Sequence, residues 1–145
     1  MRILLAFLAV VIGGCAVVQP PAPVSAPVPA PAPPAARTES AAIAGLLDGA
    51  RADAAAGRLT NAAASLERAL RIEPRNPRLW QELARVRLKQ GEYAQAESTA
   101  ARSNSWAGGD STLRAENWRL IARAREARGD AAGARAALEA AERQR

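Results

Sequence analysis

A pattern of small residues repeats three times in the C-terminal two thirds of the chain and limits the possible folds. Gly57, Gly91 and Gly129 each lie between two segments whose apolar residues recur at helical spacing. Alanine stands seven residues before and five residues after every one of these glycines. Small residues at fixed positions let two helices approach closely, so the pattern predicts helix, turn and helix in each copy. The predicted fold class is therefore all-α.

The repeat resembles the tetratricopeptide repeat in its residue types and spacing. A large apolar residue stands eleven positions before each glycine, at Leu46, Trp80 and Trp118, and Pro74 matches the proline near the end of that repeat. The resemblance implies a short superhelix of about three repeats that stack into one domain over residues 41–145, with the tryptophans in its core. The repeats are predicted at residues 43–76, 77–110 and 115–145.

Two places depart from the repeat. Asp53 stands where the pattern usually has tyrosine, and the interval between the second and third glycines is 38 residues instead of 34. We expect the additional residues to form a loop around residues 108–112, in which Asp110, Ser111 or Thr112 caps the following helix. Nearby Trp106 is expected to pack under the turn in preference to contacting a partner.

The N-terminus has the pattern of an export signal. Arg2 precedes an apolar stretch at residues 3–12, which is too short to cross a bilayer as a helix. The sequence Ile-Gly-Gly-Cys that ends at Cys15 resembles the lipobox of bacterial lipoprotein precursors. This resemblance implies that residues 1–14 are a signal peptide and that Cys15 becomes a lipidated N-terminus. The alternative is an ordinary secretory signal with an incidental cysteine.

Residues 19–36 contain eight of the ten prolines of the chain. Proline lacks an amide donor and restricts the residue before it, so this segment is expected to be extended. We predict a lipidated, proline-rich disordered tether over residues 15–40, with a reach on the order of 75 Å at about 3.1 Å per residue. A ligand for a proline-recognising domain is the alternative interpretation.

Composition argues against catalysis. The chain has no histidine, one cysteine and one lysine, so the usual acid–base groups and metal ligands are scarce. We therefore predict a protein that is not an enzyme, with no cofactor or metal beyond the lipid on Cys15 and no small-molecule substrate. Residues 41–145 hold 18 basic and 13 acidic groups, which favours an acidic partner. Nucleic acid is disfavoured because arginines alternate with glutamates and no aromatic stacking platform is present.

The tetratricopeptide resemblance implies a concave surface lined by the first helix of each repeat. Arginine occupies the same inward position in all three repeats, and guanidinium groups pair well with carboxylates. Leu47 and Leu88 are expected as apolar contacts, and Glu116 as the lone acid. The predicted partner-binding groove consists of Arg51, Arg78, Gln81, Arg85, Lys89, Arg119 and Arg123. An ordinary solvated helix face is the alternative.

The layout of lipobox, proline-rich tether and short repeat domain is similar to the LpoP-type outer-membrane lipoproteins that activate class A penicillin-binding proteins. This resemblance implies a regulator that binds and stimulates a peptidoglycan synthase. Ala16 follows the predicted lipidated cysteine, whereas an aspartate there would resemble the inner-membrane retention signal of enteric lipoproteins. By this resemblance, we expect the protein at the periplasmic face of the outer membrane. The alternative is a generic periplasmic assembly or pilotin-like adaptor that captures a client peptide.

Overall fold

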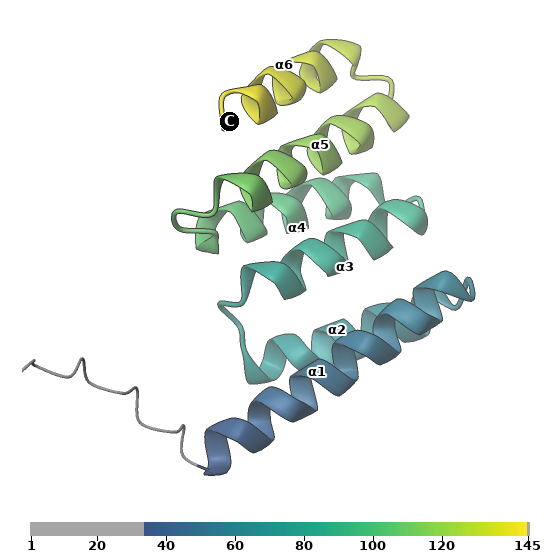
Figure 1. The fold of residues 1–145 in the computed structure, drawn as a ribbon. Helices are drawn as coiled ribbons and strands as arrows, with labels where there is room; N and C mark the ends of the chain where they lie inside the picture. The colour runs from purple at the N-terminus through teal and green to yellow at the C-terminus, as the bar shows by residue number, and fades with distance from the viewer. Residues whose placement is uncertain (1–33, 145) are drawn as a thin grey trace, which may run out of the picture. The chain divides into compact units, whose positions relative to one another are not determined.

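The computed structural model describes residues 34–144 as six α-helices, and no strand occurs within that range. Figure 1 shows the helices stacked in chain order, each antiparallel to the next. The prediction of an all-α fold built from three helix pairs is confirmed. The helices are α1 (Pro34–Ala55), α2 (Leu59–Ile72), α3 (Pro77–Lys89), α4 (Tyr93–Trp106), α5 (Ser111–Ala127) and α6 (Ala131–Glu142).

Helix α1 begins within the segment that was expected to be a tether. The helix starts at Pro34, whereas the domain was predicted to start at residue 41. Proline is tolerated in the first turn of a helix, where its missing N–H has no intrahelical acceptor. No further proline follows until Pro74, so the chain can continue as helix. The predicted signal peptide, Cys15 and the rest of the tether lie outside the described residues.

The three repeated glycines close the turns inside the helix pairs. Gly57, Gly91 and Gly129 have φ values of 75°, 79° and 82°, a region that side chains disfavour. The residue after each glycine donates its backbone N–H to the carbonyl five positions earlier, at 2.8, 3.0 and 2.9 Å. At the first turn the Asp53 carboxylate also pairs with Arg58 at 2.7 Å. Asp53 therefore pairs with Arg58 across the first turn, at the position where the repeat usually has tyrosine.

The alanines of the repeat mark the closest contacts between helices. Those seven positions before the glycines are 1%, 0% and 3% exposed, and those five positions after them are 0%, 1% and 7% exposed. Trp80 and Trp118 pack half-buried against the two apolar clusters of the core. The indole Nε1 of Trp80 donates to the carbonyl of Pro74 at 2.8 Å. The expectation that both tryptophans belong to the core is met.

The additional residues of the third repeat lengthen a helix and do not enlarge a loop, so the expected loop is wrong. The connection at residues 107–110 is as long as the one between α2 and α3, whereas α5 has 17 residues and α3 has 13. As predicted, Asp110 caps the helix, and its carboxylate accepts from the backbone N–H of Leu113 at 2.9 Å. Arg114 donates to Gln144 at 2.7 Å. The added turn therefore contacts the segment that follows α6.

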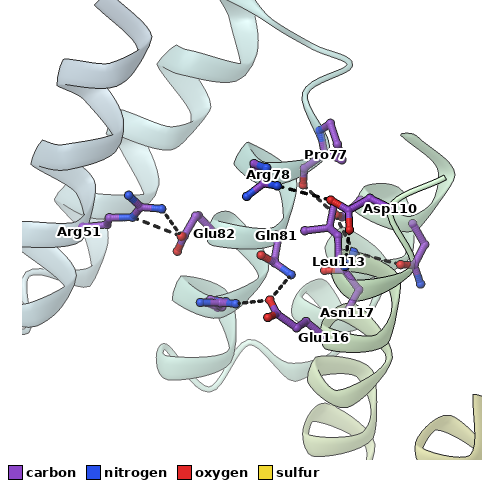
Figure 2. Close-up of polar contacts among 12 residues, drawn as sticks. Arg51, Pro77, Arg78, Gln81, Glu82, Asp110, Leu113, Glu116 and Asn117 are labelled. Carbon is purple, nitrogen blue, oxygen red and sulfur yellow. Dashed lines mark hydrogen bonds and ion pairs between the residues drawn. The ribbon is translucent and has the colours of Figure 1, made fainter. Parts of the chain in front are cut away.

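A buried polar network joins α3, α4 and α5. Ser103 and Asn117 are both 0% exposed. The hydroxyl of Ser103 donates to the carbonyl of Pro77 at 2.7 Å, and the amide of Asn117 donates to the Ser103 hydroxyl at 2.7 Å (Figure 2). The same amide donates to Asn104 at 3.0 Å. Because buried polar groups are costly when unpaired, this network fixes how the three helices meet.

Candidate protein-binding groove

A cavity of about 360 Å³ opens on the first helices of the repeats, and we call it the first-helix cavity. Leu47, Ala54, Val86 and Leu88 contribute apolar surface to its wall. Four cationic side chains surround this apolar surface, and all four were predicted to line the groove. They are Arg51, Arg85, Lys89 and Arg123.

Two of these cations are held by carboxylates of the neighbouring repeat. The Nη2 atom of Arg51 on α1 lies 2.8 Å from Glu82 on α3, and Arg85 on α3 lies 2.9 Å from Glu116 on α5 (Figure 2). Gln81 also donates to Glu116, at 3.1 Å. Adjacent first helices are therefore linked by charge-assisted hydrogen bonds across the concave side.

Lys89 and Arg123 differ from the other two cations of the cavity. Neither makes an ion pair with any side chain of residues 41–144. An incoming carboxylate can therefore meet these two cations without displacing an acid of the protein itself. The cavity combines free positive charge with an apolar wall, which suits an acidic peptide segment that also carries an aliphatic side chain.

The remaining predicted groove residues lie outside the wall of this cavity. Arg78 contacts Asp110 at 3.4 Å, and Arg119 lies 4.0 Å from Glu142. Gln81 is only 6% exposed, so its amide contributes to the helix interface and not to an open surface.

The expectation that Glu116 is the lone acid among the predicted groove residues is wrong. Glu82 pairs with Arg51, and Asp110 pairs with Arg78. Glu82 was missed because its contact joins two repeats. A pattern that is read within one repeat does not reveal a pair between Arg51 and a residue 31 positions later. Asp110 was considered only as a helix cap, which it is, although its carboxylate also reaches Arg78.

Trp106 lies at the end of α4 and is 39% exposed, so it packs only in part. The guanidinium of Arg75 stacks over its ring at 5.2 Å from the centroid.

The described residues contain no group of three potential metal ligands. None of the helices between residues 34 and 144 has the length and apolar character needed to cross a membrane.

Comparisons with known proteins agree with this architecture. A family model described as tetratricopeptide repeat matches residues 53–115. The structure of the globular C-terminal domain of P. aeruginosa LpoP is 49% identical in sequence, with a TM-score of 0.68. The alignment covers 69% of this chain and 94% of that domain. No curated protein matches the chain. The predicted tetratricopeptide repeats are confirmed.

Proposed function

The chain belongs to the LpoP family of tetratricopeptide-repeat proteins, and from this membership we propose that it is a non-enzymatic lipoprotein that binds and stimulates a class A penicillin-binding protein. Repeat domains of this kind are scaffolds that present binding surfaces. The chain contains no histidine. The carboxylates beside the cavity pair with arginine and glutamine side chains. The proposed action is therefore recognition of the synthase and stabilisation of its active form.

The first-helix cavity is the surface that we propose for synthase binding. The observation that carries this proposal is the presence of Lys89 and Arg123, two cations without ion-pair partners within residues 41–144, at the wall of an apolar cavity. An acidic segment of the synthase gains charge-assisted hydrogen bonds there, and an aliphatic side chain of the same segment is removed from water. Arg51 and Arg85 are held in place by their own carboxylate partners and shape the opening.

We further propose that Cys15 carries the lipid and that the protein resides at the periplasmic face of the outer membrane. The support is the Ile-Gly-Gly-Cys sequence and the proline-rich segment that follows it. A synthase anchored in the inner membrane can be reached from the outer membrane only across a gap. An extended proline-rich segment crosses such a gap at a lower entropic cost than a flexible chain.

The experiment adds the full-length chain in nonionic detergent to a class A penicillin-binding protein of the same organism and follows glycan polymerisation and peptide cross-linking. Stimulation by the wild-type chain is the expected result. The double variant K89E/R123E is expected to bind the synthase at least about tenfold more weakly, since two attractive contacts become repulsive.

A matched control is R135E/R143E, which makes the same change in charge at two exposed residues, one on α6 and one at its C-cap. It should stimulate like the wild type. If the wild-type chain neither binds nor stimulates the synthase, the regulator proposal fails and the adaptor alternative takes its place. If it stimulates but both double variants behave alike, the function stands and the first-helix cavity is not the binding surface.

A further inference from the structure

A second exposed surface lies where α2 and α4 end, and we call it the second-helix surface. Figure 1 shows that both helices end on the same side of the stack, at the loops that lead into α3 and α5. Two of the three exposed large hydrophobic side chains of the described residues belong to this surface. It consists of Arg68, Arg71, Ile72, Arg75, Arg102 and Trp106.

The residues of this surface recur with the repeat. Arg68 and Ile72 are four positions apart on α2, and Arg102 and Trp106 are four positions apart on α4, 34 residues further along. Side chains at this spacing share one face of a helix. Each of the first two repeats therefore presents an arginine beside a large apolar side chain, and Ile72 and Trp106 are 43% and 39% exposed.

Stacking orders two of these arginines. The guanidinium of Arg75 lies 5.2 Å from the ring centroid of Trp106, and that of Arg102 lies 5.4 Å from the ring centroid of Trp80. A guanidinium that stacks on a ring keeps its N–H groups at the edge available for hydrogen bonds. Ordering the side chain in advance also lowers the entropy lost when a carboxylate binds.

The charge of this surface is not neutralised by the fold. None of its four arginines makes an ion pair with a residue of the range 41–144, in contrast to Arg51 and Arg85 of the first-helix cavity. Glu73, the acid of the adjoining loop, accepts a hydrogen bond from Asn76 at 2.7 Å. Much of the basic excess of the domain is therefore exposed on the second-helix surface.

We propose that the second-helix surface binds an acidic segment of a protein partner that carries an aliphatic or aromatic side chain. Tryptophan and arginine are the side chains most often responsible for affinity in protein interfaces. A lipid surface fits less well because membrane-surface helices need a broad apolar face, whereas this part of α2 exposes arginines around one isoleucine. Base stacking fits less well because Arg75 already covers the ring of Trp106.

The test uses the full-length chain in nonionic detergent with K89E/R123E already in place, so that the free cations of the first-helix cavity do not contribute. The probe is a short fluorescein-labelled peptide of glutamates around a single leucine, and binding is followed by fluorescence anisotropy. R71E/R102E is expected to weaken binding at least about tenfold. R135E/R143E, with the same change in charge, should weaken it less than about threefold. Circular dichroism checks that the helix content is unchanged.

A second variant tests the apolar part of the surface. Trp106→Ser is expected to weaken binding of the leucine peptide more than that of a peptide with serine in place of leucine, because both peptides lose the ordering of Arg75 and only the first loses an apolar contact. The proposal is wrong if the starting chain does not bind the peptide, if the two charge-reversed variants lose equal affinity, or if Trp106→Ser affects both peptides alike. A water-soluble short-chain phosphatidylglycerol provides the last comparison, because detergent dissolves vesicles and a lipid on Cys15 would insert the chain into any vesicle. If R71E/R102E abolishes binding of this lipid and leaves peptide binding intact, the ligand is a lipid headgroup and the proposed protein partner is wrong.

Discussion

Ser103→Ala tests whether the buried polar network stabilises the junction of α3, α4 and α5. The substitution removes the hydroxyl that donates to the carbonyl of Pro77 and accepts from the amide of Asn117, both at 2.7 Å. Steric strain is not expected, because alanine occupies the equivalent positions of the other two repeats and is buried there. The effect on stability therefore reports the hydrogen bonds and not the packing.

The expected loss follows from the groups left without partners. Each hydrogen bond contributes about 1 kcal/mol net, and a buried group left unpaired costs about 1–3 kcal/mol. Asn117 keeps its bond to Asn104, which limits the damage on that side. Alanine regains about 0.5 kcal/mol through its higher helix propensity. We expect the free energy of unfolding to fall by about 2 kcal/mol, which lowers the Tm by roughly 8 °C in a domain of this size.

Thermal unfolding followed by circular dichroism measures this shift, with Ser105→Ala as the matched control. Ser105 lies on the same helix but is exposed, and its hydroxyl donates to the carbonyl of Arg102 within that helix. The control should shift the Tm by less than about 2 °C, because exposed substitutions change stability by about 0.5 kcal/mol or less. Equal shifts for the two variants would refute the stabilising role of the network.

Three further pairs of values can be measured in the same unfolding assay. Gly49→Ala lies at an exposed position inside α1, where no side chain and no other helix comes within 4 Å of the new methyl group, and it should raise the free energy of unfolding by about 0.5–1 kcal/mol. Gly91→Ala, at φ +79°, should lower the free energy of unfolding by about 1 kcal/mol or more. Changes of equal sign would contradict this. Leu66→Ala should lower the free energy of unfolding by about 3 kcal/mol, and Leu138→Ala should lower it by less than about 0.5 kcal/mol. The two leucines stand at the same repeat position, but their side chains are 1% and 49% exposed. Similar losses would mean that Leu138 on α6 is shielded from solvent. Asp110→Ala should lower the free energy of unfolding by about 1 kcal/mol, because the N-cap of α5 is lost. Asp110→Asn retains a capping oxygen and should keep most of that stability.

The sequence was sufficient for those features that each repeat determines locally. Glycine at a position with positive φ, and alanine where two helices touch, follow from sterics, so the turns and the helix pairs could be predicted. Leu47 and Arg51 were expected on the concave side because the tetratricopeptide resemblance implies inward positions there, and both line the cavity.

The missed features depend on how one repeat lies against the next. The contact of Arg51 with Glu82 and the shared use of Glu116 by Gln81 and Arg85 are set by the offset between neighbouring helices, which no spacing within a repeat reveals. The added residues near Asp110 were assigned to a loop around residues 108–112. The capped first turn of α5, with Leu113 buried, is more stable than an open loop.

The position of the first-helix cavity against α1 has a mechanical consequence. The chain before Pro34 enters the fold through α1, and the cavity is bordered by α1 on one side and α3 on the other. When a bound partner is pulled away from the N-terminus, the force passes from α1 into the partner directly, through α2 into α3, and through the contact of Arg51 with Glu82. Helix α5 shares the load through Arg123 at the cavity wall, whereas α4 and α6 do not line the cavity. Helix α1 is the element that joins the pulled chain to the cavity, so its detachment would limit how much tension the complex withstands.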